Sequence, residues 1–367
     1  MYIIGDIAIS LLITYLSFSN FLATEIDSWF PAQENTEITK IAEPTPRIPE
    51  VITSLPSRIG NAIPDILLRS TNYQKAAIIE SSGDQIGAST NEPLEAIVNI
   101  LCTFTTDEYV RTTTGTGFFI DPDGVIITNA HVAQFLLLEE TSELGESECV
   151  VRSGNPAAPT YRAELLYLPP SWVQENAGVM HQAVPMGTGE RDYALLYASE
   201  TIDNSPLPAR FPALGFDNSL LPVSTIGESV VAAGYPAGNL LENGPSADLI
   251  PQKASTTVSE LYTFGSNHAD VFSIRGSAVG EQGASGGPVL NTEGNAIGMI
   301  VTRGDDQVDG PGSLRAITFS HIEQTIFEET GFSLARNVGG NLPYRADIFA
   351  ETLTPFLLTL LQQESTN

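Results

Sequence analysis

The chain has 367 residues and a formal net charge of −28, with 16% charged residues against about 25% in an average soluble domain. Its 42% hydrophobic content, 31 glycines and 24 prolines are typical of a folded, turn-rich chain, not of an acidic disordered one. This acidic composition argues against nucleic-acid binding and against charge-driven binding to an anionic membrane.

The N-terminal segment is the most hydrophobic stretch of the chain. Residues 7–24 carry no charge and would span about 27 Å as a helix, close to the ~30 Å hydrocarbon core of a bilayer. The first basic residue is Lys40, so the positive start of a signal peptide is missing. We interpret residues 1–24 as an uncleaved transmembrane anchor, with a signal peptide or a buried helix as alternatives. Recurrent prolines make residues 25–93 a linker without its own core.

From residue 94 the pattern changes to short apolar or alternating runs separated by Gly, Pro, Asn and Asp. Such runs predict strands of an all-β barrel or sandwich, and their two groups of six favour two small barrels. The Asp-Pro-Asp-Gly sequence at 121–124 predicts a hairpin turn. The predicted strands are Leu94–Phe104, Thr114–Ile120, Val125–Thr128, Glu148–Arg152, Tyr161–Leu168, Tyr193–Ala198, Ser229–Ala233, Ala254–Thr263, Val271–Arg275, Gly287–Asn291, Ala296–Val301 and Ala316–Ser320.

Helical signals follow the last strand. Ser320 and Glu323 fit a capping box, which predicts a helix to about Thr330 that ends at Gly331. Within a C-terminal tail, residues 331–367, apolar residues recur at helical spacing over 346–363. We expect one helix there that packs on the body of the protein, with binding to a partner or a membrane surface as the alternative.

Three segments carry residues suited to nucleophilic catalysis. They are GTGFFI and TNAHV around His131, RDYALL around Asp192, and GEQGASGGPVL around Ser285. A serine hydroxyl needs an adjacent base, histidine serves as that base near neutral pH, and a buried carboxylate fixes its tautomer. Glycines beside Ser285 allow a sharp turn, in which the N–H groups of Gly283 and Ser285 converge on a developing oxyanion.

Together these segments, in the order His, Asp, Ser, resemble the trypsin/chymotrypsin-like serine endopeptidases, closest to the bacterial HtrA-like branch. AAGYPAG at 232–238 is similar to the segment that opens that family's second barrel. The resemblance covers residues 94–330. It implies an all-β fold of two six-stranded antiparallel barrels with the site between them, and peptide-bond hydrolysis through an acyl-enzyme, without metal or cofactor. His131 would be the base, Asp192 the orienting carboxylate and Ser285 the nucleophile, acting on protein or peptide substrates.

The chain departs from the family pattern in several places. Ala284 replaces the aspartate that pairs with a freed N-terminus in secreted relatives, so we expect no such zymogen switch. Leu168–Glu190 is a long insert that we predict to be a surface loop. The tail is too short for the PDZ module that many HtrA-like proteins carry, so none is expected.

The resemblance also indicates a substrate pocket with Val279 at its base and walls from Ile300, Val301 and Thr302. An acidic residue at the base would select Lys or Arg in the substrate residue before the cleaved bond (P1). An apolar base instead predicts a small or apolar P1 side chain.

The two cysteines would lie on neighbouring strands of the first barrel, because the family's first strand closes against its fourth. Cys102 falls on the first strand and Cys149 on the fourth. A disulfide between them would fit an extracytoplasmic location, either membrane-anchored or secreted. Two buried free thiols are the alternative.

Two other functions compete with a protease. Gly283-x-Ser285-x-Gly287 also matches the nucleophile elbow of α/β-hydrolase esterases, but Pro288 and a strand follow where that fold needs a helix. A catalytically silent, protease-like binding module is the second alternative. The sequence carries no signal for an oligomeric state.

Overall fold

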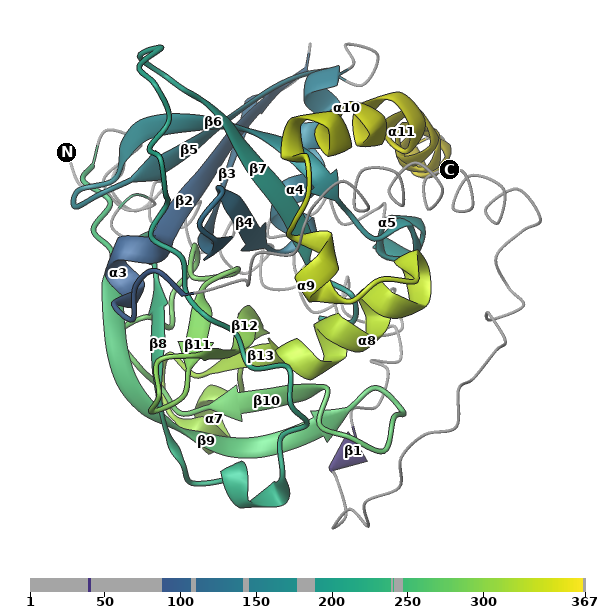
Figure 1. The fold of residues 1–367 in the computed structure, drawn as a ribbon. Coiled ribbons are helices and arrows are strands. Elements are labelled where there is room, and N and C mark those ends of the chain that lie inside the picture. The colour runs from purple at the N-terminus through teal and green to yellow at the C-terminus, as the bar shows by residue number, and fades with distance from the viewer. Residues whose placement is uncertain are drawn as a thin grey trace, which may run out of the picture. The chain divides into compact units, whose positions relative to one another are not determined.

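The computed structural model describes residues 39–40, 88–106, 110–140, 145–176, 189–238, 240 and 247–365. Two β-barrels make up most of this part (Figure 1). Within it, no helix is long and apolar enough to cross a membrane, and the predicted anchor at residues 7–24 lies outside it.

The first barrel is a closed six-stranded antiparallel barrel in the order β2-β3-β4-β7-β6-β5. Its first strand pairs with its fourth, as expected. In the turn between β3 and β4, the N–H of Gly124 donates to the carbonyl of Asp121, and Gly124 has φ of +101°. The strands are β2 (Ile97–Thr105), β3 (Val110–Asp121), β4 (Val125–Thr128), β5 (Glu146–Ser153), β6 (Ala158–Tyr167) and β7 (Ala194–Thr201).

The second barrel runs β9-β10-β13-β12-β11-β8 and closes through a β8–β9 pairing, with β1 (Thr39–Lys40) added at the edge of β9. The predicted fold of two six-stranded barrels is therefore confirmed. The strands are β8 (Ser229–Gly234), β9 (Gln252–Thr263), β10 (Val271–Ile274), β11 (Pro288–Leu290), β12 (Ala296–Arg303) and β13 (Leu314–Thr318).

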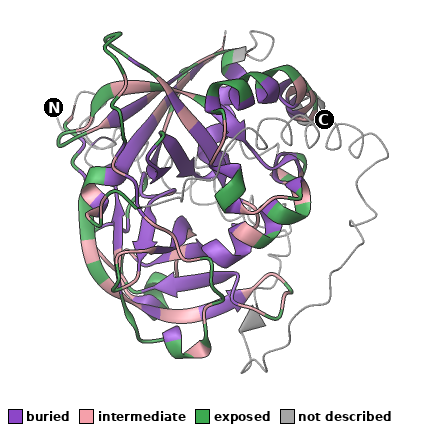
Figure 2. Cartoon of the chain, in the orientation of Figure 1, coloured by how far each residue is buried: buried purple, intermediate pink, exposed green. Residues whose placement is uncertain are grey.

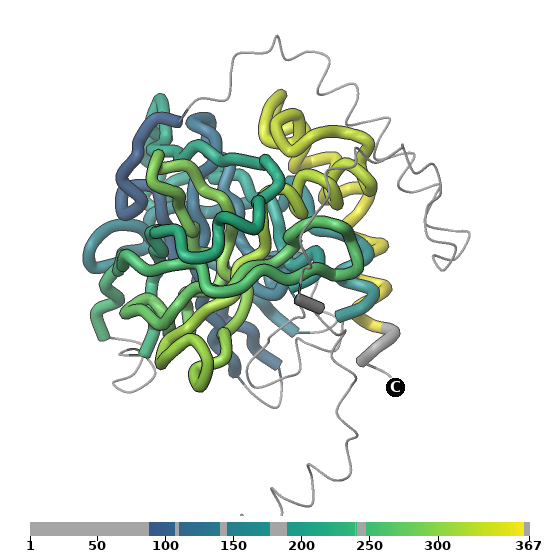
Figure 3. Tube along the Cα trace, turned by 90° about the horizontal axis from the view of Figure 1, so that it is seen from below, coloured from purple at the N-terminus to yellow at the C-terminus, as the bar shows by residue number. Residues whose placement is uncertain are grey.

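Most of the helices lie on one side of the barrels (Figures 1 and 3). The longer ones are α4 (Ala130–Leu137), α8 (Phe319–Thr330), α10 (Leu342–Thr352) and α11 (Thr354–Ser365). The shorter ones are α3 (Pro93–Ala96), α5 (Pro170–Asn176), α7 (Asp306–Asp309) and α9 (Leu334–Asn337), with 3-10 turns at Leu138–Glu140 and Val223–Thr225.

Three details of the helical predictions were wrong. α8 ends at Gly331 as expected, but its N-cap is Thr318, whose hydroxyl accepts from the N–H of His321. The tail forms two helices where one was predicted, because Pro355 in the first turn of α11 cannot continue a helix. The insert 168–190 begins as α5 with a buried Trp172, not as a surface loop.

Each barrel has its own core, and the tail helices extend the first one. Phe349, Leu353, Leu357 and Leu361 are buried in the same cluster as the apolar residues of β2, β4 and β7. Figure 2 shows buried residues along the barrel strands and on the inner faces of α10 and α11. The tail therefore packs on the body of the protein, as its apolar spacing predicts.

Candidate active site

The structure brings His131 and Asp192 into direct contact. His131 is the second residue of α4, directly after β4, and Asp192 lies two residues before β7, which pairs with β4. The Nδ1 atom of His131 lies 2.7 Å from Oδ2 of Asp192, and the backbone N–H of His131 donates to Oδ1 at 3.0 Å. Asn129 donates its amide to the carbonyl of Asp192 at 2.8 Å.

Burial strengthens this arrangement. Asp192 is fully buried and His131 is 4% exposed. Because both carboxylate oxygens bind one histidine, the imidazole is held in a single orientation with Nδ1 towards Asp192. A proton taken up by the ring would then enter at Nε2, and the buried carboxylate would stabilise the resulting imidazolium.

The loop that carries Ser285 lies against the first barrel. The N–H of Thr116, on β3, donates to the carbonyl of Ser285 at 2.7 Å. Gly286 has φ of +87°, and a Cβ there would lie 1.9 Å from the carbonyl of Thr116. Glycine is therefore required for this close approach, which places the serine loop one strand away from β4 and the start of α4.

Two hydrogen bonds fix the peptides on either side of Gly283. The N–H of Ala237 donates to the carbonyl of Gln282 at 2.6 Å, and the hydroxyl of Thr116 donates to the carbonyl of Gly283 at 2.6 Å. The N–H and C=O of a trans peptide point in opposite directions. The bond to Gln282 therefore turns the Gly283 N–H away from Ala237. Gly283 has φ of +93°, and a Cβ there would lie 2.6 Å from the carbonyl of Tyr235.

The residues predicted to form the substrate pocket lie in the second barrel. Val279, Ile300 and Val301 are buried, and Val279 belongs to the core cluster of that barrel. Thr302 is half-buried on β12. The segments 276–280 and 310–313 approach each other backbone to backbone, since a Cβ at position 280 would lie 1.9 Å from the carbonyl of residue 312.

Cys102 and Cys149 form a disulfide that joins β2 to β5. The two residues are directly opposite each other in the register of the two strands. This pairing is the one that the family resemblance implies.

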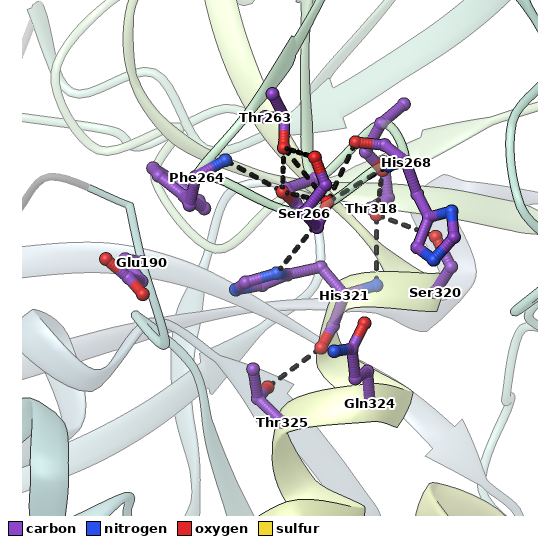
Figure 4. A network of polar contacts seen from close by, with 12 residues as sticks. Glu190, Thr263, Phe264, Ser266, His268, Thr318, Ser320, His321, Gln324 and Thr325 are labelled. Atoms are coloured by element: carbon purple, nitrogen blue, oxygen red, sulfur yellow. Dashed lines mark hydrogen bonds and ion pairs between the residues drawn. The ribbon is translucent and has the colours of Figure 1, made fainter. Parts of the chain in front are cut away.

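A second aspartate–histidine pair lies in the other barrel (Figure 4). The carboxylate of Asp270 is 3.2 Å from Nδ1 of His321 and accepts from the hydroxyls of Thr263 and Ser266 and from the N–H of Phe264. Burial opposes ionisation, but these donors and His321 lower the pKa of Asp270 below its ordinary value. The pair fixes the loop between β9 and β10 to the start of α8.

Sequence reasoning missed two residues next to the candidate triad. Thr116 was quoted only as part of GTGFFI, although it donates two hydrogen bonds to the serine loop and accepts a third from the N–H of Tyr235. Arg191, directly before Asp192, has φ of +54° and contacts α8. An arginine in front of the predicted aspartate and two glutamates in α8 were the available signals.

A model of the trypsin-like peptidase domain matches residues 115–299, half of the chain. The chain belongs to the trypsin-like peptidase family. This match includes all three candidate triad residues, and the fold around them is that of the family. The esterase alternative fails, since a strand and not a helix follows Ser285.

Individual relatives of this trypsin-like domain are distant. The chain is 24% identical over 259 residues to mouse serine protease HTRA4 and 25% identical to rat serine protease HTR4. In each case 70% of this chain is covered, and the chain spans 42% of the relative's length. The Rv3671c protease from M. tuberculosis in its active form is 19% identical with a TM-score of 0.39, over 80% of this chain and 95% of that one.

Proposed function

We propose that this chain is a serine endopeptidase that cleaves peptide bonds through an acyl-enzyme. The contact between His131 and Asp192 carries the proposal, because a fully buried carboxylate that binds the imidazole with one oxygen and the backbone N–H of the same histidine with the other orients a general base. Membership of the trypsin-like peptidase family supports the same activity.

The proposed mechanism gives each residue of the triad a defined role. His131 takes the proton of Ser285 as its hydroxyl oxygen attacks the substrate carbonyl, and the new bond gives a tetrahedral oxyanion. The N–H groups of Gly283 and Ser285 would stabilise that oxyanion. His131 then protonates the leaving amine, and a water molecule activated by His131 hydrolyses the acyl-enzyme. Asp192 stays ionised and holds the imidazolium.

The orientation of the Gly283 peptide supports the proposed oxyanion hole. Its N–H is turned away from Ala237 by a bond within the folded chain. Ala284, where secreted relatives have an aspartate, is fully buried. We therefore propose that the site needs no freed N-terminus for activation. Attaching extra residues at the N-terminus should leave activity unchanged, whereas a requirement for a new α-amine would contradict this.

A small or apolar P1 side chain is the specificity that the pocket residues support. Val279 offers no carboxylate to a basic side chain. A peptide library varied at P1 tests this. We expect a preference for residues such as Ala and Val, and strong cleavage after Lys or Arg would contradict it.

Labelling with a fluorophosphonate probe tests the activity itself. The probe should label the wild-type chain and lose its signal in Ser285→Ala, while the exposed Ser219→Ala control keeps it. Casein cleavage should be lost in the same variant. A chain that neither labels nor cleaves would instead be a silent binding module.

We further propose an extracytoplasmic location, either anchored by residues 1–24 or secreted. The disulfide between Cys102 and Cys149 supports this, since such bonds persist mainly in oxidising compartments. Thiol-trapping of the chain from cells should find both cysteines oxidised, and free thiols would contradict the location.

A further inference from the structure

The backbone in front of Asp192 is held in an unusual conformation. Arg191 has φ of +54°, in the left-handed region that residues with a side chain rarely adopt and only where the surroundings enforce it. The N–H of Asp192 donates to the carbonyl of Gly189, and the N–H of Tyr193 to that of Arg191. Because Asp192 is the next residue, the direction of its carboxylate depends on this turn.

The guanidinium of Arg191 lies near three carboxylates, of which Glu329 is the least exposed. The guanidinium lies 3.4 Å from Glu190, 3.7 Å from Glu328 and 3.4 Å from Glu329. Burial alone would lower the pKa of Arg191, but Glu329 and the other two carboxylates raise it above its ordinary value. The side chain of Glu328 is 48% exposed and that of Glu329 only 11%, so the ion pair with Glu329 is less screened by water.

Glu329 is itself fixed by the first barrel. The hydroxyl of Tyr167, at the end of β6, donates to Oε2 of Glu329 at 2.5 Å, and the hydroxyl of Ser171, in α5, donates to Oε1. Burial raises the pKa of Glu329, while these donors and Arg191 favour its ionised form. A carboxylate with this many partners is a rigid point of attachment and not a solvated surface charge.

The same face of α8 touches the neighbours of Arg191. Thr325, one turn before Glu329, lies 3.0 Å from the hydroxyl of Tyr193. One further turn back, the ring of His321 extends towards Glu190 (Figure 4), and burial raises the pKa of Glu190 while Arg191 and His321 lower it. Spacing of four residues places these α8 side chains on one side of the helix, which therefore faces Glu190, Arg191 and Tyr193.

We propose that Glu329 is a positioning residue for the catalytic aspartate: through Arg191 it holds the left-handed turn that directs Asp192 at His131. This inference rests on the proposed function, because it takes Asp192 as a member of the triad. It makes the α8 helix after the second barrel part of the catalytic apparatus of the first.

The central test replaces Glu329 by glutamine, which keeps its size and removes its charge. For Glu329→Gln we expect kcat to fall about 10- to 100-fold, with KM changed less than about twofold, since small displacements of catalytic groups have effects of this size. The low-field NMR signal of the proton between His131 and Asp192 should shift or disappear. Glu328→Gln is the matched control, on the same helix and with the same change in charge, and should stay within about twofold of wild type.

A double-mutant cycle tests whether Glu329 acts on Asp192 through Arg191. Arg191→Gln should reproduce the loss, and the double variant should lose no more than the larger single loss. The proposal would be overturned if the double variant lost kcat by the product of the two single losses. A folded Glu329→Gln with wild-type kcat and a wild-type NMR signal would also overturn it. If Glu329→Gln does not fold, Arg191→Gln alone decides by the same criteria. If the wild type shows no turnover, the proposed function fails, and the NMR comparison still tests whether Glu329 positions Asp192.

Discussion

The hydroxyl of Thr116 is shared between two backbone groups of the second barrel. It donates to the carbonyl of Gly283 and accepts from the N–H of Tyr235 at 2.9 Å, while the Thr116 N–H holds the carbonyl of Ser285. Thr116 is fully buried, so water cannot replace these bonds when the hydroxyl is removed. Thr116 thus holds the carbonyls of Gly283 and Ser285, the two residues whose N–H groups form the proposed oxyanion hole.

Thr116→Val should therefore impair catalysis in a chain that still folds. Valine keeps the shape but leaves the carbonyl of Gly283 and the N–H of Tyr235 without a partner, which costs about 1–3 kcal/mol of stability. We expect kcat to fall tenfold or more, because without the bond to its carbonyl Gly283 can shift and carry its N–H away from the oxyanion. Thr112→Val, exposed on the same strand, is the control for kinetics and thermal melting. Normal kcat in a folded Thr116→Val would show that the peptide is fixed without this hydroxyl.

Asp270 gives a prediction for stability against pH. Its folded-state pKa lies below its ordinary value, so its contribution is present above the ordinary aspartate pKa near ~3.9 and is lost as the pH falls through the lower folded value. Asp270→Asn should therefore melt below wild type at neutral pH, and the difference should shrink in strong acid. Equal differences in melting temperature at neutral pH and at about pH 2 would refute this.

At the scale of helices and strands, the sequence predicted strands better than helix ends. Val125–Thr128 was predicted with its observed bounds, because a short apolar run that follows a turn defines a buried strand locally. The cap of α8 was misplaced because Thr318 and Ser320 are both good N-caps, and a tertiary contact decides between them. The hydroxyl of Thr318 also donates to the carbonyl of Ala269, next to β10.

In the candidate site too, local motifs were predictable from the sequence and contacts made by tertiary packing were not. Residue type and family motif pointed to His131 and Asp192, and the structure places these two in contact. The pairing of Arg191 with Glu329 could not be predicted, because it depends on how α8 packs across the first barrel. No local pattern encodes a contact between segments so far apart in the chain.

The disulfide between β2 and β5 gives a prediction about stability against unfolding. It closes a loop between positions 47 residues apart, and the chain-entropy model assigns such a loop about 4 kcal/mol of stability. We expect the double variant Cys102→Ala, Cys149→Ala to unfold at lower denaturant concentration by about that free energy. Wild type under reducing conditions should match the double variant, and adding reductant to the variant is the control. A midpoint that neither change moves would contradict the prediction.

For the whole molecule, the net charge of −28 sets the field that a substrate meets. No motif accounts for this charge, so we interpret it as a solvating surface that also repels acidic substrates. Two peptides with the same P1 residue, one with Lys and one with Glu at a distant position, should differ several-fold in kcat/KM at low salt.

That difference should vanish as salt is added, because the screening length falls from about 30 Å at ~0.01 M to about 3 Å at ~1 M. A neutral peptide, whose rate should not depend on salt, is the control. Glu281 lies four residues before Ser285 and accepts from the N–H of Gly238, so Glu281→Gln separates a local effect from the field of the whole surface. The bias should persist in this variant. A bias that disappears with Glu281, or a wild-type bias insensitive to salt, would show that a local contact and not the net charge selects the substrate.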